Sequence, residues 1–282
     1  HCSAPEVILS ALSQRTTTMR MGHGVVLLPY PFNHPIRVAE RIASLDIMSN
    51  GRVDFGTGRG IFLFEMEPFQ IDPAHSRGMW AEAVDIIPRM WTEEEFTFEG
   101  QYCRIENPIN VVPKPVQKPH PPILLPLDSQ QSFEPMGRMG YRIAIGGGST
   151  HNERGDAVLK EDVERYRQAW RDAGHPGNPA VAIRIATHVA ATREEVIRAR
   201  ETVMKASNQT AAAVGRTDYG YSSQNTDNMF GTPEEVVERI HQLEEDFGSD
   251  SIMCDMVGYF LPRETVLQSM RVLADKVLPK VK

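Results

Sequence analysis

The sequence places an arginine between two glycines at Gly58-Arg59-Gly60, directly after an apolar stretch that predicts a β-strand. Glycines let the backbone approach a ligand closely, and the planar fork of an arginine guanidinium matches the geometry of a phosphate group. In parallel α/β folds, ligands bind where strands end and helices begin. The tripeptide alone is more typical of a surface turn with a solvated arginine, so a phosphate site requires further residues.

Arg77 is a second cation near this turn. It lies three residues before Trp80 and seven before Val84, which predicts that it falls on the apolar face of its helix. It is also close to the N-terminus of that helix, where the helix dipole disfavours a cation. A cation buried there needs an anionic partner, which would be either a structural carboxylate or the phosphate of a ligand.

Three further positions could contact a ligand. Ser129 follows the apolar stretch 123–127 at the start of a helix, where free N–H groups favour an anion; a simple helix cap is the alternative and does not exclude phosphate. Gly24-Val25 interrupts an apolar strand, where a glycine suits the close approach of a flat ring, although a bulge would also explain it. His34 precedes a helix and is either a neighbour of its cap or a wall of the site.

Several common catalytic patterns do not occur in the sequence. The histidines and cysteines show no metal-ligand spacing, and no Ser–His–Asp order or pair of catalytic carboxylates can be assigned. The glycine run 146–148 matches neither the Walker pattern nor the dinucleotide-binding pattern. We therefore predict no metal site and no standard nucleotide-binding fold.

Alternating apolar strands and amphipathic helices must position these candidates. Such alternation is typical of a parallel sheet with helices outside it. The predicted strands cover residues 19–28, 52–58, 123–127, 143–145, 180–190 and 252–257. Predicted helices begin near residues 5, 35, 73, 129, 156, 193, 233 and 263. Six strands fit a doubly wound sheet as well as an incomplete eight-stranded barrel, so the strand count leaves both open.

The chain shows no repeat or composition shift that would divide it, and we expect one domain over residues 1–282. A hairpin is predicted at 93–106, followed by a proline-rich strap that ends at residue 122. Residues 208–230 are polar and lack periodicity, which predicts a mobile loop that could act as a lid.

Composition excludes several classes of protein. Lys and Arg total 30 against 37 Asp and Glu, and the net charge of -7 argues against a basic nucleic-acid-binding patch. No apolar run approaches the roughly 20 residues of a membrane span, and the polar start predicts no signal peptide. The three cysteines form no Cys-x-x-Cys pair, so we expect a reducing, cytoplasmic location.

The segment from His34 to Gly60 reads HPIRVAERIASLDIMSNGRVDFGTGRG. It resembles the signature of the bacterial luciferase-like family of flavin-dependent oxidoreductases, which carries His-Pro, Ala-Glu, Leu-Asp, Ser-x-Gly-Arg and Gly-x-Gly-Arg-Gly in this order. The segments SAPEVILSALSQRT, GTPEEVVERI and LPRETVLQSMRVLADKVLP extend the resemblance over most of the chain. The resemblance implies an α/β fold of the (β/α)8 TIM-barrel type. It also implies that this chain lacks the first strand, the first helix and the second strand.

The resemblance assigns roles to the candidate residues. In the family, the arginine of the glycine turn and one in the following helix bind the flavin phosphate, and these positions match Arg59 and Arg77. A serine after the next strand also contacts the phosphate, and Ser129 occupies that place. The flavin ring packs near a non-proline cis peptide, which is implied at Gly24–Val25. The cofactor-binding residues expected are Arg59, Arg77, Ser129, Asp128, Gly58, Gly60, Gly24 and Val25.

Two departures from the family pattern matter. The usual catalytic histidine lies at the end of the second barrel strand, upstream of His1, which leaves His34 as the catalytic candidate. The reactive cysteine that some luciferases carry just before the phosphate arginine is Gly58 here, which argues against light emission.

The resemblance implies a monooxygenase that uses reduced FMN and oxygen on a small organic substrate. It further implies a homodimer served by a separate flavin reductase. A deazaflavin-dependent dehydrogenase, which moves a hydride without oxygen, is the alternative because one fold serves both reactions. A third possibility is a truncated, non-catalytic flavin-binding relative, suggested by the missing initial Met and the missing strands.

Overall fold

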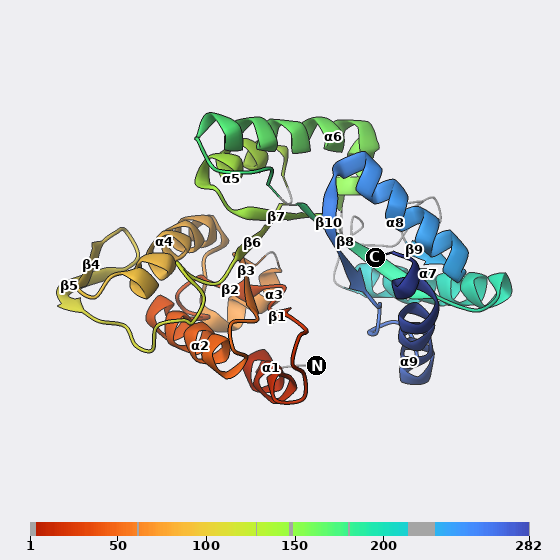
Figure 1. Cartoon of the computed structure of the whole chain (residues 1–282), viewed down its shortest axis with the longest axis horizontal. Helices are drawn as coiled ribbons and strands as arrows, with labels where there is room; N and C mark the ends of the chain where they lie inside the picture. Colours follow the sequence, from red (N-terminus) through yellow and green to blue (C-terminus); the bar gives the residue numbers. More distant parts are fainter. Residues whose placement is uncertain are drawn as a thin grey trace. The chain divides into compact units, whose positions relative to one another are not determined.

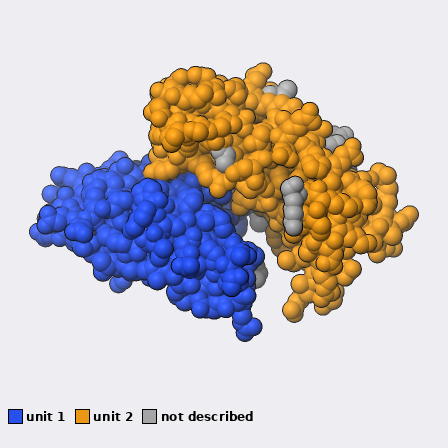
Figure 2. All heavy atoms as spheres, viewed as in Figure 1, with its two compact units in different colours: residues 1–126 blue, residues 127–282 orange. Residues whose placement is uncertain are grey.

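A computed structural model describes residues 4–60, 62–127, 129–146, 149–179, 181–213 and 229–281, with side chains undescribed at 149–157 and 211–213. The chain forms two compact units, His1–Pro126 and Leu127–Lys282, which are coloured separately in Figure 2. The single domain expected over 1–282 stays a prediction.

The first unit contains short parallel strands and the helices that cover them. Its elements are α1 (Pro5–Ser13), β1 (Met21–Gly22), β2 (Val26–Leu27), α2 (Pro35–Met48), β3 (Val53–Gly58), α3 (Leu63–Met66), the 3-10 turn η1 (Glu67–Phe69), α4 (Pro73–Thr92), β4 (Phe96–Glu99), β5 (Arg104–Ile109) and β6 (Ile123–Pro126). Strands β1, β2 and β6 all pair with β3 in parallel.

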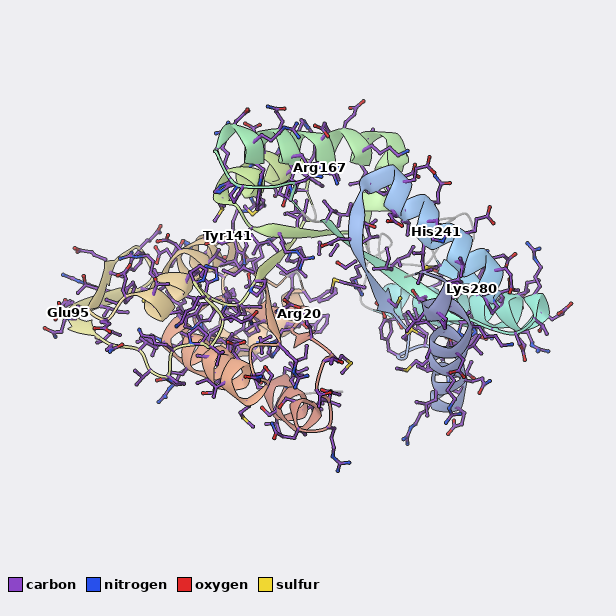
Figure 3. The ribbon with its side chains drawn as sticks, viewed as in Figure 1. Arg20, Glu95, Tyr141, Arg167, His241 and Lys280 are labelled. Carbon is purple, nitrogen blue, oxygen red and sulfur yellow. The ribbon has the colours of Figure 1, made fainter. Side chains whose placement is uncertain are left out.

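The strand expected over 19–28, with an interruption at Gly24, forms two short strands, β1 and β2, and the ladder breaks between them. Val26 follows Gly22 by four positions, whereas its partner Thr57 follows Asp54 by three. The segment therefore contains a one-residue bulge, which is the alternative that the glycine at position 24 had suggested. Beside β1, Arg20 pairs with Asp54 of β3 at 2.7 Å; Arg20 is labelled in Figure 3.

The core of the first unit lies between β3 and the helices α2 and α4, which pack against each other (Figure 1). Trp91 of α4 is 2% exposed; its indole Nε1 donates to the carbonyl oxygen of Ala39 at 3.0 Å. Its ring meets that of Phe55 edge to face, with centroids 5.5 Å apart. The apolar periodicity of both helices thus predicts the face that they bury.

The hairpin expected at 93–106 is formed by β4 and β5, and a strap follows it. Lys114 of the strap donates from Nζ to two carbonyl oxygens at the end of α4, at 2.7 and 2.6 Å. Gln117 donates from Nε2 to Oδ1 of Asp46 at 2.7 Å, and Asp46 is fully buried. These bonds hold the strap across α4 and α2.

The second unit repeats the alternation of parallel strands and helices (Figure 1). Its elements are η2 (Gln130–Ser132), α5 (Phe133–Met139), β7 (Arg142–Ile145), α6 (Ser149–Asp172), β8 (Val181–Val189), α7 (Arg193–Ala213), β9 (Met229–Gly231), α8 (Pro233–Phe247), β10 (Ser249–Asp255), α9 (Arg263–Val272), the π-helical turn η3 (Leu273–Val277) and η4 (Leu278–Lys280). Strands β7, β9 and β10 each pair with β8 in parallel.

The boundaries of α8 follow the sequence closely. Thr232 and Glu235 form a reciprocal capping box at its start, and Gly248 ends it in the left-handed conformation. The loop expected over 208–230 is shorter than predicted, because residues 208–213 belong to α7 and residues 229–230 to β9. Residues 214–228 lie outside the described part, so the lid stays a prediction. Among the described residues, no helix combines the length and the apolar character needed to cross a membrane.

Candidate functional site

The end of β3 lies against the segment around β2 with no room for side chains. Leu28 donates from its backbone nitrogen to the carbonyl oxygen of Gly58 at 2.9 Å. A Cβ on Gly58 would lie 2.6 Å from Cγ2 of Val25, and a Cβ on Gly56 would lie 1.9 Å from the carbonyl oxygen of His23. Both positions therefore require glycine. At Gly58, the missing side chain makes room for Val25.

The peptide bond between Gly24 and Val25 is cis, as the resemblance implied. Gly24 is exposed, whereas Val25 is half-buried against Gly58. Because Gly24 has no side chain, a flat group can approach its backbone directly. The assignment of a flavin ring to this position stays a prediction.

Arg59 follows β3 and is half-buried. The next residue, Gly60, has a φ of +79°, a conformation that favours glycine. Gly60 is buried, and a Cβ there would lie 3.3 Å from Cε of Met66 and 3.7 Å from Cδ2 of Leu27. Within the part of the chain that the structure describes, Arg59 has no hydrogen-bond or ion-pair partner. Its guanidinium is therefore available to an external anion.

Arg77 is exposed, so the prediction that it falls on the apolar face of α4 is wrong. Val84 and Ile87 on that face are buried, but the start of the helix is exposed at residues 73–75 as well as at Arg77. No described residue pairs with Arg77. Among these residues, therefore, no structural carboxylate is the anionic partner of Arg77. A cation in the first turns of a helix, where the dipole opposes it, gains stability from an anionic ligand.

A hydrogen bond ties the two arginine-bearing segments together. The indole Nε1 of Trp80 in α4 donates to Oγ1 of Thr57 in β3 at 2.9 Å. Thr57 is fully buried and precedes Arg59 by two residues. Trp80 follows Arg77 by three residues. The first unit thus brings the end of β3 and the start of α4 into one locality, as a phosphate site requires.

The remaining predicted residues have other placements. His34 is exposed and caps α2, accepting at Nδ1 from the backbone nitrogen of Ile36 at 3.3 Å. Ser129 belongs to the second unit, where its Oγ lies 2.8 Å from Oγ of Ser132 and makes no helix cap bond. Asp128 lies outside the described residues.

His23, which the sequence assigns to the core or the surface and not to a metal site, lies close to the candidate site in the chain. It is 6% exposed, and neither ring nitrogen has a hydrogen-bond partner among the described residues. Burial lowers its pKa, an effect that Glu6 opposes and Arg41 reinforces. A histidine in an apolar stretch between two glycines was the available signal. Among the described residues, no group of three or more His, Cys, Asp or Glu side chains is placed to hold a metal ion.

Comparison with known proteins assigns the class. Residues 1–250 match the family model described as luciferase-like monooxygenase. The chain therefore belongs to the luciferase-like monooxygenase family.

Two curated relatives illustrate the range of similarity. An uncharacterized protein y4wF of Sinorhizobium fredii is 31% identical over 160 residues, which are 56% of this chain and 46% of that protein. Limonene 1,2-monooxygenase of Rhodococcus erythropolis is 27% identical over 301 residues, covering 98% of this chain and 73% of that protein. The chain spans about half the length of the first curated relatives it matches, with shares of 46% and 59%.

Solved structures share the fold. The monooxygenase RslO1 from Streptomyces bottropensis matches with a TM-score of 0.86 and 27% identity, covering 100% of this chain and 84% of that one. The oxygenating constituent of 3,6-diketocamphane monooxygenase from Pseudomonas putida, in complex with FMN, matches at 0.77 with 21% identity, covering 100% and 87%. The coenzyme F420-dependent tetrahydromethanopterin reductase of Methanopyrus kandleri matches at 0.74 with 17% identity, covering 98% and 87%. These likenesses confirm the predicted fold class, a parallel α/β fold of the (β/α)8 barrel type.

Proposed function

We propose that the protein is a flavin-dependent monooxygenase that binds reduced FMN and oxidises a small organic substrate with oxygen. One observation carries the proposal: Arg59 and Arg77 lie without partners among the described residues, on segments joined by the Thr57–Trp80 hydrogen bond. Two guanidinium groups without partners in that part of the chain match the charge and geometry of a phosphate group.

The residues present fit the cofactor. Arg59 and Arg77 would hold its phosphate, and half-burial of Arg59 limits the screening of its charge by water and salt. The exposed backbone at Gly24 would accept the flat ring. When bound, reduced FMN supplies the electrons that activate oxygen. His34 is engaged in capping α2 through Nδ1, so we assign it no proton transfer at that atom.

Spectral titration tests the choice of cofactor. The protein is titrated with FMN and, under the same conditions, with a deazaflavin, and oxygen uptake by the complex with reduced FMN is then followed. We expect FMN to bind at micromolar concentrations and the bound reduced flavin to consume oxygen. Binding of the deazaflavin alone would contradict the monooxygenase proposal.

The second candidate is a deazaflavin-dependent dehydrogenase. The likeness to an F420-dependent reductase at a TM-score of 0.74 supports it at the level of fold. Because one fold hosts both reactions, the titration decides between them. Flavin binding without turnover of any substrate would instead support the third possibility, a non-catalytic relative.

Partners and location belong to the proposal as well. A relative described as the oxygenating constituent of a monooxygenase supports the need for a separate flavin reductase. The proposal of a homodimer is supported only by the family resemblance. Cys103 is buried and Cys254 half-buried, and both are free thiols, which is consistent with the cytoplasmic location expected from the sequence.

A further inference from the structure

We propose that Glu82 and Tyr102 are positioning residues that hold Arg77 in place from the β4–β5 hairpin. The inference rests on the phosphate-binding role proposed above for Arg77. We call the contacts made by Glu82 and Tyr102 the hairpin clamp. All of its residues belong to the first unit.

Glu82 of α4 holds the tip of the hairpin through backbone donors. Its Oε1 accepts from the nitrogens of Gln101 at 2.6 Å and Tyr102 at 3.2 Å. Its Oε2 accepts from the nitrogens of Tyr102 at 3.1 Å and Cys103 at 3.1 Å. Hydrogen bonds to a carboxylate are stronger than those between neutral groups, so one side chain fixes three consecutive residues to the helix.

The same carboxylate reaches the segment after β2. Tyr30 donates from its hydroxyl to Oε2 of Glu82 at 3.0 Å. Burial, reinforced by the nearby thiol of Cys103 and by Glu82, raises the pKa of Tyr30, which keeps the hydroxyl protonated as a donor. The clamp therefore joins three segments: the residues after β2, helix α4 and the hairpin tip.

Tyr102 contacts α4 on both sides of Arg77. Its hydroxyl lies 2.9 Å from Nδ1 of His75, and the two rings meet edge to face with centroids 5.8 Å apart. A Cβ on Gly78 would lie 2.6 Å from Cε2 of Tyr102, so the ring sits directly on the helix backbone there. His75 and Gly78 bracket Arg77 in the first two turns of the helix.

Among the described residues, none restrains the side chain of Arg77 itself. It is exposed and lacks a partner among the described residues. Arg77 is the fifth residue of α4, and Asp72 caps the helix by accepting from the backbone nitrogen of Ala74 at 2.9 Å. The orientation of Arg77 toward an anion must therefore come from the backbone, which the clamp contacts at Gly78.

If Tyr102 had a purely structural role, its substitution would weaken the binding of FMN and of riboflavin equally. A double-mutant cycle separates this role from the positioning of Arg77. The affinities of FMN and of riboflavin, which lacks the phosphate, are measured for the wild-type protein and for Tyr102→Phe, Arg77→Ala and the double variant. Tyr102→Phe keeps the ring and removes only the bond to His75. Tyr102→Ala removes the ring as well. Arg104→Ala, on the exposed face of β5, is the matched control.

We expect Tyr102→Phe to weaken FMN binding about two- to tenfold, which corresponds to the loss of one hydrogen bond, and Tyr102→Ala to weaken it further. Riboflavin affinity should not change in either variant. In the Arg77→Ala background, the Tyr102 substitutions should cause no additional loss, because the clamp acts only through Arg77. Urea unfolding of each variant verifies that it is folded.

Equal losses for FMN and riboflavin would overturn the inference, and so would an undiminished loss in the Arg77→Ala background. Failure of the proposed function gives another result. If Arg59→Ala and Arg77→Ala leave FMN affinity unchanged, or if the wild-type protein binds neither flavin, the phosphate site itself is wrong and this inference falls with it.

Discussion

Trp80 donates a hydrogen bond from its indole nitrogen to the hydroxyl of Thr57 at 2.9 Å, and this bond joins helix α4 to strand β3. Thr57 is fully buried, so its hydroxyl has no access to solvent as a substitute partner. The two residues flank the candidate arginines in sequence, with Arg59 after Thr57 and Arg77 before Trp80. We therefore infer that the Thr57–Trp80 hydrogen bond positions the end of β3, with Arg59, relative to the start of α4, with Arg77.

Replacing Trp80 with Phe should loosen this link. The hydroxyl of Thr57 would lose its donor while remaining buried, which costs about 1–3 kcal/mol of unfolding free energy. FMN affinity should fall as well, because both arginine-bearing segments lose a common anchor. Trp170→Phe is the matched control, since that indole donates to the carbonyl oxygen of Pro176 at 3.2 Å at an exposed site of the second unit. Urea denaturation and FMN titration give the two readouts, and equal behaviour of both variants would count against the assignment.

Gly58→Ala should destabilise the protein by overpacking. The new Cβ would lie 2.6 Å from Cγ2 of Val25, and such crowding costs about 1–3 kcal/mol. Val25→Ala removes the crowding atom, so the double variant should recover much of the lost unfolding free energy. Gly56→Ala is the comparison, because its Cβ would meet the backbone oxygen of His23 at 1.9 Å, where no side-chain truncation can help. Rescue of Gly56→Ala by Val25→Ala, or no rescue of Gly58→Ala, would contradict the packing described for β3.

Two buried histidines predict how stability depends on pH. Burial lowers the pKa of His23 and of His188 below the ordinary value of 6.5. As pH falls through 6.5, these two histidines bind protons in the unfolded chain but stay unprotonated in the folded protein. The unfolding free energy should therefore decrease on acidification, until the lower folded-state pKa is reached.

Replacing His23 with Leu should flatten this dependence between about pH 7 and pH 5, because one of the two contributing groups no longer titrates. Urea midpoints across that range measure the effect. His241→Gln, at an exposed position of α8 labelled in Figure 3, is the comparison variant. An unchanged slope in His23→Leu would show that His23 does not resist protonation in the folded state.

Much of the fold could be predicted from local patterns. The helix α8 carries its own start and stop signals in Thr232, Pro233 and Gly248, and the apolar spacing of α2 predicts its buried face. Residues 208–213 were missed as helix because their polar start hides a run of alanines, a strong helix former. The break between β1 and β2 depends on pairing with β3, which a strand-by-strand analysis does not include.

The site was predictable where residue type alone decides the chemistry. Arg59 between glycines and the position of the cis peptide at Gly24–Val25 followed from the motif and the resemblance. The exposure of Arg77 did not follow, because the spacing that correctly places Val84 and Ile87 in the core does not indicate that the start of the helix is exposed. The hairpin clamp could not be predicted from the sequence, because Glu82 accepts hydrogen bonds from backbone donors nineteen to twenty-one residues away.

The central claim is that Arg59 and Arg77 bind the phosphate of a flavin, and the ratio of the riboflavin Kd to the FMN Kd tests it directly. We expect a ratio of about ten or more for the wild-type protein, because one charge-assisted hydrogen bond contributes about 1.5–3 kcal/mol. The ratio should fall in Arg59→Ala and in Arg77→Ala and approach one in the double variant, but it should not change in Arg37→Ala, a paired and exposed arginine of α2. A wild-type ratio near one, or a ratio that survives the loss of both arginines, would contradict the account.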